Sequence, residues 1–366
     1  MSKRLSYGIN VIRITACLMV FMLHSTIFEP EIDMLLENKN LFFLYPSAWA
    51  GVWIFFITGG YLAGLTFQTK YEVSLNGVFC YYSRRIKRTI IPTVCFIILC
   101  YLLVYPMLIK DLPEVLFRFF TFQYKGTPGA NGVGATWYVS TLLFFYLISP
   151  AIIAAVKFIR KYSEKAIILL FVLLVLFGAV SRYIAFINDM NWNDVVYTPW
   201  YFNIDLYVGG VLLAYFPNVR IIKNGKCISY ISYILFFLTI LMNAYLQRKM
   251  RYGGLRSRYV CCYLFQTVYL IIVAIFIRSN QVGKEDLNDY PGAKIIKSFA
   301  NISFEFYLFH SLVLQIWSEI LRNYIKIDSF WKHIAFLIII GLITIILSLG
   351  YHRIFIYKNT KKEILH

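Results

Sequence analysis

The chain has 366 residues, of which 60% are hydrophobic, 19% are aromatic and only 15% are charged. This composition excludes a soluble globular protein, a disordered chain, a collagen-like repeat and a small disulfide-rich scaffold. The formal net charge of +18 is carried mostly by loops. In a membrane protein, basic loops set orientation, so the charge gives no reason to expect a nucleic-acid partner.

Apolar runs of about twenty residues, the length that crosses a bilayer as a helix, recur along the whole sequence. They predict an all-α, polytopic bundle of about ten transmembrane spans. Lys3 and Arg4 precede the first run, which has no small-residue cleavage site and is expected to be retained. We expect a single membrane domain over residues 1–366, without an appended extracellular domain. The predicted spans cover residues 8–28, 49–67, 90–109, 137–156, 166–187, 199–216, 229–246, 259–277, 298–321 and 333–355.

Lys and Arg concentrate in the segments that are cytoplasmic when the N-terminus is inside, which predicts that both termini are cytoplasmic. One outer loop departs from this rule. It is either a tolerated exception or a face that attracts an acidic or pyrophosphate-linked acceptor. Two irregular outer segments, 110–136 and 188–198, can line an entrance. The basic residues of the exceptional loop are Arg248, Lys249, Arg251, Arg256 and Arg258.

The first predicted span contains two ionisable residues, Arg13 and His24. They are eleven residues apart, which is about three helical turns, so they share one face at a separation of roughly 16 Å. Ionisable groups inside spans are costly and usually face the bundle interior, so both can face one internal cavity. The alternatives are that Arg13 extends to the cytoplasmic interface and that His24 is a structural, hydrogen-bonded histidine.

The second span reads Gly51-Val-Trp-Ile-Phe-Phe-Ile-Thr-Gly-Gly-Tyr61. Its glycines permit close helix approach, and Thr58 can bond across helices. The following loop ends in a basic cluster at the cytoplasmic mouth of the third span, which contains Arg84, Arg85, Lys87 and Arg88. Arginine pairs bind phosphate oxygens bidentately, so the cluster suits a phosphate-rich ligand, although topology and lipid headgroups explain it equally well.

His310 lies within the ninth span, three residues after Tyr307 and on the same side of the helix. It can support an acceptor or the His24 network, or it can be a hydrogen-bonded histidine in an aromatic packing segment. His333, His352 and His366 receive no role. The seven cysteines show neither metal spacing nor a disulfide framework, and no metal is implied.

These motifs, in this order and on successive spans, resemble the membrane-bound acyltransferase family 3. The matching elements are Arg13-x10-His24, the second-span glycine motif and Tyr82-Ser-Arg-Arg-Ile-Lys-Arg88, followed by Trp137-Tyr138 through Tyr146-Leu-Ile-Ser-Pro150 and by Phe306-Tyr-Leu-Phe-His310. The resemblance covers nearly the whole chain. It implies transfer of an acyl group, usually acetyl, from cytosolic acyl-CoA to a hydroxyl of a surface glycan or a lipid-linked precursor. It also implies a bacterial inner-membrane location.

The resemblance implies that Arg13 and His24 form the essential first-span pair and that Arg85 and Arg88 bind the acetyl-CoA donor, with Arg84 adjacent. Two departures stand out. Thr58-Gly59 replaces the Ser-Gly common in the family, and the fourth span lacks the carboxylate that many members carry. A carboxylate partner for His24 then has to come from elsewhere, and the candidates are Asp205, Glu305 and Glu319. Supporting roles are expected for Thr58, Tyr61, Trp137, Glu305, Tyr307 and His310.

Together these features predict a donor held at the cytoplasmic mouth, with Arg13 helping to position its pantetheine arm and His24 meeting the thioester as a general base or as a transient acyl carrier. The partners are then acyl-CoA, a glycan or lipid-linked sugar, and membrane lipid, with the oligomeric state left open. The competing interpretation is a transporter or flippase of a lipid-linked sugar, which inverted repeats of broken helices would favour. No such repeat is visible in the sequence.

Overall fold

The computed structural model describes residues 3–27, 45–122, 133–217, 225–251, 255–281, 290 and 292–357. Of these residues 89% are helical and none lies in a strand, which confirms the predicted all-α class. The helices are α1 (Lys3–Ile27), α3 (Ala48–Thr69), α4 (Leu75–Arg85), α5 (Ile91–Leu103), α6 (Leu112–Phe120), α7 (Trp137–Tyr162), α8 (Glu164–Ile187), α9 (Ile204–Tyr215), α10 (Gly225–Arg251), α11 (Leu255–Arg258), α12 (Phe265–Asn280), α13 (Ala293–Ile316) and α14 (Phe330–Tyr351).

Eight of the described helical segments are long and apolar enough to cross a membrane. Two of them continue through a π-helical turn, η2 (Ile86–Ile90) between α4 and α5 and η7 (Tyr259–Leu264) between α11 and α12. Eight of the ten predicted spans correspond to these segments and agree with them to within several residues at most ends. The eight segments are Lys3–Ile27, Ala48–Thr69, Leu75–Leu103, Gly134–Tyr162, Glu164–Ile187, Lys226–Met250, Leu255–Asn280 and Phe330–Ile354.

The sixth and ninth predicted spans differ from these eight. The sixth forms α9, which has only 12 residues and is therefore about 18 Å long, short of a full crossing. The ninth forms α13, which has 24 residues but carries Lys294, Lys297 and Glu305. The total of ten spans and the cytoplasmic position of both termini stay predictions.

Outward-facing apolar side chains mark the surface of the bundle that faces lipid. Large hydrophobic residues are exposed along α8, α10 and α14, including Leu173, Phe177, Leu238 and Ile346. A soluble protein rarely exposes apolar surface on this scale, and its helices bury such faces. The exposed faces and the eight long apolar segments indicate a multi-pass membrane protein.

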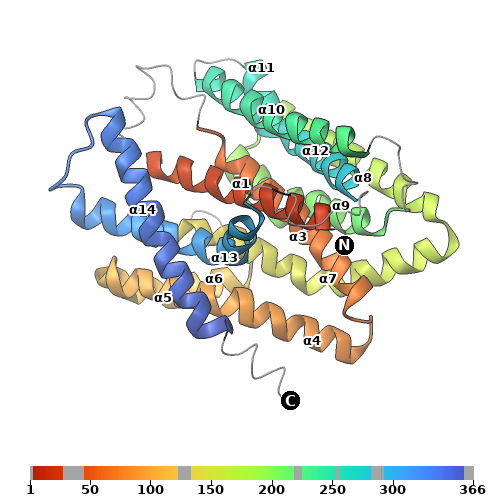
Figure 1. Cartoon of the computed structure of the whole chain (residues 1–366), viewed down its shortest axis with the longest axis horizontal. Helices are drawn as coiled ribbons and strands as arrows, with labels where there is room; N and C mark the ends of the chain where they lie inside the picture. Colours follow the sequence, from red (N-terminus) through yellow and green to blue (C-terminus); the bar gives the residue numbers. More distant parts are fainter. Residues whose placement is uncertain are drawn as a thin grey trace.

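Helices α1 and α13 lie in the middle of the bundle, with α4 and α5 along one side and α10 and α12 along the other (Figure 1). Helix α3 crosses both α1 and α9 at close range. A Cβ atom at Gly51 would overlap the Ala16 carbonyl oxygen of α1. At the other crossing, a Cβ at Gly60 would overlap the Tyr207 carbonyl oxygen, and one at Gly210 would overlap that of Ile57. The close approach expected from the second-span glycines is confirmed.

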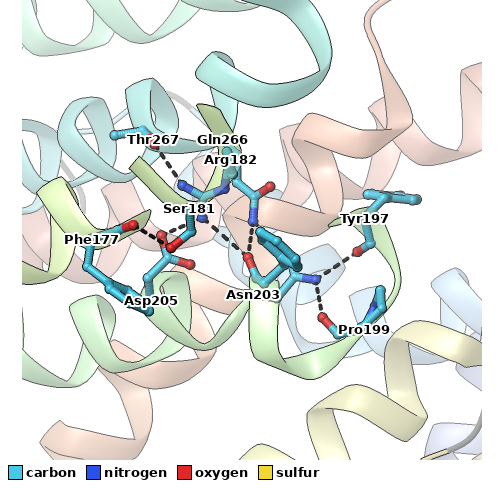
Figure 2. A network of polar contacts seen from close by, with 10 residues as sticks. Phe177, Ser181, Arg182, Tyr197, Pro199, Asn203, Asp205, Gln266 and Thr267 are labelled. Carbon is cyan, nitrogen blue, oxygen red and sulfur yellow. Dashed lines mark hydrogen bonds and ion pairs between the residues drawn. The ribbon is translucent and has the colours of Figure 1, made fainter. Parts of the chain in front are cut away.

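A buried polar network joins α8, α9 and α12 (Figure 2). The Arg182 guanidinium of α8 pairs with the Asp205 carboxylate of α9 at 2.5 Å and donates to Thr267 Oγ1 of α12 at 2.7 Å. Both charged side chains are almost fully buried, at 1% and 3% exposed. Charges in an apolar interior persist only when paired and hydrogen-bonded, so this network fixes three helices in one arrangement.

Candidate active site

Helices α1 and α13 bring the predicted site residues of the first and ninth spans together. Arg13 Nη2 donates to Ser303 Oγ at 3.0 Å, and Cys17 Sγ donates to the Ser303 carbonyl oxygen at 3.4 Å. Further along the same two helices, His24 Nδ1 lies 2.9 Å from His310 Nε2. The shared helix face predicted for Arg13 and His24 is therefore the face that contacts α13.

Hydrogen bonding defines the tautomers of the two histidines. His310 Nδ1 lies 3.1 Å from the Phe306 carbonyl oxygen, which can only accept, so this nitrogen carries a proton. In a neutral ring His310 Nε2 is then an acceptor, and His24 Nδ1 donates to it. The remaining nitrogen, Nε2 of His24, has a free lone pair. His310 is completely buried whereas His24 is partly exposed, so the lone pair belongs to the more accessible ring.

A cavity of about 630 Å³ opens beside this seam, between α1, α3, α4, α7 and α13. Its wall contains the arginine of α1 and the arginines of the basic cluster, together with tyrosines and small hydroxyl residues. Residues of the cavity wall include Arg13, Thr58, Gly59, Tyr81, Arg84, Arg85, Arg88, Tyr138, Tyr146, Ser303, Glu305, Tyr307 and His352. This volume lies within the range of about 300–1,000 Å³ typical of small-molecule sites.

Arg85 is held between two tyrosine rings. Its guanidinium carbon lies 5.1 Å from the centre of the Tyr81 ring and 4.4 Å from that of Tyr146. Its Nη1 also donates to the Tyr146 hydroxyl at 3.4 Å. The π-helical turn that begins at Ile86 changes the helical phase, yet Arg84, Arg85 and Arg88 all line the same cavity. Such a group of arginines attracts a multiply charged anion and can bind it bidentately.

Tyr138 and Tyr307 of the cavity wall pack together next to the histidine pair and form an aromatic layer. Their ring centres are 5.3 Å apart, and Tyr307 also lies 5.7 Å from the His310 ring. The Tyr307 hydroxyl donates to the Ala135 carbonyl oxygen at 2.7 Å. Arg13 is among the described residues of the cavity wall, and Tyr307 connects this wall to the histidine pair.

The model of the acyltransferase domain matches residues 6–353, which is nearly the whole chain. The chain belongs to the acyltransferase 3 family. No curated protein and no solved structure matches it. The match supports acyltransferase activity and covers both the α1–α13 seam and the arginine-lined cavity.

Two of the three candidate carboxylates of this acyltransferase have partners other than His24. Asp205 pairs with Arg182, and Glu305 Oε1 lies 2.9 Å from His352 Nδ1. Glu319 lies in the exposed turn η9 (Trp317–Leu321). Among the residues that the structure describes, the hydrogen-bond partner of His24 is His310 rather than an acid. Among the described residues, we therefore find no contact between His24 and any of the three carboxylates that were expected as candidates to support it.

Three predicted supporting residues lie at different distances from the site. Thr58 lines the cavity, but its hydroxyl donates to the Ile54 carbonyl oxygen of its own helix at 2.8 Å rather than across helices. The Tyr61 hydroxyl accepts from Gln281 Nε2 at 3.4 Å and is not part of the cavity wall. Trp137 packs edge-on against Tyr197 at 4.6 Å, beyond the aromatic layer.

Sequence reasoning missed several residues that the fold brings to the acyltransferase site. Tyr146 and Tyr138 belong to a segment that the family motif singled out, but their packing on Arg85 and Tyr307 depends on how α7 meets α4 and α13. His352 received no role from the sequence because it lies near a helix end. Its partner Glu305 lies within a predicted span, and this position was the available signal that the carboxylate needed a cationic or hydrogen-bond-donating partner. Within the described ranges, no group of His, Cys, Asp or Glu side chains could hold a metal ion.

Proposed function

We propose that this chain transfers an acyl group, acetyl in the simplest case, from cytosolic acyl-CoA to a hydroxyl group of a cell-envelope glycan or its lipid-linked precursor. One observation carries the proposal: a cavity with four arginines in its wall ends next to a hydrogen-bonded histidine pair. A bacterial cytoplasmic membrane is the location that fits, because acyl-CoA is cytosolic and envelope glycans are completed on the opposite side.

The donor is proposed to enter from the arginine cluster. Arg84, Arg85 and Arg88 would hold the phosphates of coenzyme A. The tyrosine rings around Arg85 would keep the plane of its guanidinium oriented towards the ligand. The pantetheine arm would extend along Thr58 and Gly59 towards Arg13. Since Arg13 is anchored by Ser303, it can donate hydrogen bonds to amide carbonyls of this arm without leaving its place.

His24 Nε2 is the proposed catalytic base. It would remove the proton from the acceptor hydroxyl while the hydroxyl oxygen attacks the thioester carbonyl. Collapse of the tetrahedral intermediate would break the carbon–sulfur bond, and the proton on His24 would pass to the departing thiolate. His310 would keep His24 in the required tautomer and stabilise the transient positive charge by accepting from Nδ1. If the acyl group is instead carried on His24, the same nitrogen forms the bond.

The aromatic layer implies a conformational step. We take this layer of Tyr138 and Tyr307 to separate the cavity from the histidine pair, so one of the two rings would have to turn for the thioester to reach His24. The Tyr307 hydroxyl donates to the Ala135 carbonyl oxygen, at the start of the segment that leads into α7, so its position is linked to that segment. Closing the layer in the absence of donor would keep water and ions from crossing the bundle.

The decisive experiment uses purified protein in nanodiscs and measures acetyl-CoA binding and thiol release. His24→Ala is expected to bind acetyl-CoA like the wild type and to release no thiol. Arg85→Ala/Arg88→Ala is expected to lose binding. Absence of acetyl-CoA binding by folded wild-type protein would contradict the proposal and favour a transporter of lipid-linked sugars. Mass spectrometry of a quenched reaction distinguishes an acylated His24 from direct transfer.

A further inference from the structure

A second cavity, of about 450 Å³, lies outside the arginine-lined site and has no role so far. It is formed by the first turn of α3, by the segment between α8 and α9 that contains η5 (Trp192–Tyr197), and by the α11 region. Two indole rings and a set of polar side chains share its wall. The wall residues that matter for its chemistry are Trp49, Asp189, Asn191, Trp192, Asn193 and Arg258.

Aromatic rings form one side of this cavity and are fixed in place. The Trp49 and Trp192 ring centres are 4.1 Å apart, and Trp192 stacks on Tyr197 at 4.8 Å with an interplanar angle of 10°. Trp192 Nε1 donates to the Cys262 carbonyl oxygen at 2.6 Å. Both indoles are only partly buried, so they present aromatic surface to the cavity.

The cavity wall also contains exposed polar groups, which can both donate and accept hydrogen bonds. Asn191 and Asn193 flank Trp192, and both are exposed. Arg258 Nη1 lies 3.6 Å from Asp189 Oδ1 in a loose, solvent-exposed ion pair. Such a pair contributes little to stability and is easily exchanged for another anion.

The backbone beneath the cavity is held by the buried network of Figure 2. Asn203 Nδ2 donates to the carbonyl oxygens of Tyr197 and Pro199, at 2.7 and 2.9 Å. Gln266 Nε2 in turn donates to Asn203 Oδ1 at 3.1 Å, next to the Arg182–Asp205 pair. The segment that carries Trp192 is therefore anchored to the membrane helices, which lowers the entropic cost of binding a ligand there.

We propose that this cavity binds an acidic sugar unit of the acceptor glycan, an inference that rests on the proposed acyl transfer and identifies the acceptor class. The C–H face of a pyranose ring packs on the electron-rich face of an indole, which Trp49 and Trp192 provide. The hydroxyl groups match the amides of Asn191 and Asn193. A sugar carboxylate takes the place of Asp189 on the Arg258 guanidinium, which binds it bidentately.

A continuous series of aromatic rings connects this cavity to the histidine pair. The series begins with Trp192 and Tyr197. The Tyr197 ring centre lies 4.6 Å from that of Trp137, which is followed in α7 by Tyr138. Tyr138 contacts Tyr307, whose ring lies 5.7 Å from that of His310. Because a glycan is a chain of sugars, one unit bound at Trp192 can hold the polymer while another unit meets His24.

The test measures oligosaccharide binding and donor chemistry separately on full-length protein in nanodiscs. Isothermal titration calorimetry is run with hexagalacturonate, which is acidic, and with maltohexaose, which is neutral. Hexagalacturonate is expected to bind more tightly than maltohexaose. Arg258→Gln is expected to lower the affinity for hexagalacturonate about tenfold, which corresponds to the loss of one charge-assisted hydrogen bond. Arg256→Gln, on the same short helix but outside the cavity wall, is the matched control and is expected to leave binding unchanged.

Trp192 packs on Tyr197, so its replacement by alanine risks misfolding, and Asn193→Ala provides the second, exposed variant. It is expected to weaken hexagalacturonate binding while acetyl-CoA binding stays at the wild-type level. The inference is overturned if wild-type protein binds acetyl-CoA but not hexagalacturonate, if maltohexaose binds equally well, or if Arg256→Gln and Arg258→Gln lose the same affinity. Failure of acetyl-CoA binding itself would instead count against the proposed function.

Discussion

His24 Nδ1 lies 2.9 Å from His310 Nε2, and the two imidazole rings are stacked with their centres 5.1 Å apart and an interplanar angle of 25°. The two residues are far apart in sequence and come from α1 and α13. The Phe306 carbonyl fixes the proton on the far side of His310, so the direction of donation runs from His24 to His310. A histidine here takes the place that a carboxylate occupies in many base-orienting pairs.

This direction of donation predicts how substitutions of His310 behave. His310→Ala removes the acceptor for His24 Nδ1 and should lower the rate of thiol release by about 10²–10⁴-fold, because the base is neither oriented nor held in its tautomer. His310→Gln keeps an amide oxygen that can accept and should retain more activity than alanine. Acetyl-CoA binding, measured in parallel, should be unaffected in both variants. Equal activity of the alanine and glutamine variants would argue against an orienting role.

The double tyrosine contact of Arg85 predicts that lysine cannot replace it. Arg85→Lys keeps the charge but loses the planar stacking on Tyr81 and Tyr146 and the bidentate geometry, so the Kd for acetyl-CoA should rise about tenfold. Lys87→Gln removes a charge from the adjacent, exposed turn outside the cavity wall. If general basicity alone attracts the donor, Arg85→Lys will bind acetyl-CoA like the wild type and Lys87→Gln will bind it more weakly.

The Arg182–Asp205 pair predicts strong non-additivity in stability. Asp205→Leu leaves the Arg182 charge buried without its carboxylate and should destabilise the protein by about 3–5 kcal/mol. Arg182→Met/Asp205→Leu removes both charges and should recover most of that loss. The measurement is thermal unfolding in detergent, monitored by the exposure of buried cysteines. A double variant no more stable than the single one would show that the network contributes more than charge compensation.

The crossing of α3 and α9 predicts a steric effect at Gly210. A methyl group there would overlap the Ile57 carbonyl oxygen, so Gly210→Ala should force the helices apart and cost about 1–3 kcal/mol. Gly350 is the matched control because no atom lies within 4 Å of an added Cβ. Gly350→Ala should leave the unfolding temperature unchanged or raise it slightly, since alanine is the better helix former. Similar losses in the two variants would contradict the close-packing argument.

The sequence by itself determined the membrane class, the all-helical fold and the positions of most spans, because hydropathy and helix length depend on local composition. It also singled out Arg13, His24 and His310, since ionisable residues in apolar runs are conspicuous, and Arg85, which belongs to a basic cluster at the mouth of a span. It was less informative for α9 and α13. Both segments have apolar runs that predict spans, but α9 is shorter than a full crossing and α13 carries charged residues, so their places depend on their neighbours.

Only the tertiary structure decided which groups meet. The pairing of His24 with His310, of Glu305 with His352 and of Asp205 with Arg182 joins residues on different helices, and such contacts are set by helix packing rather than by spacing along the chain. The same is true of the tyrosine layer that packs beside the histidines. Local sequence fixes what each helix is made of, whereas the crossing geometry, governed by glycine contacts and buried polar bonds, fixes which side chains share a site.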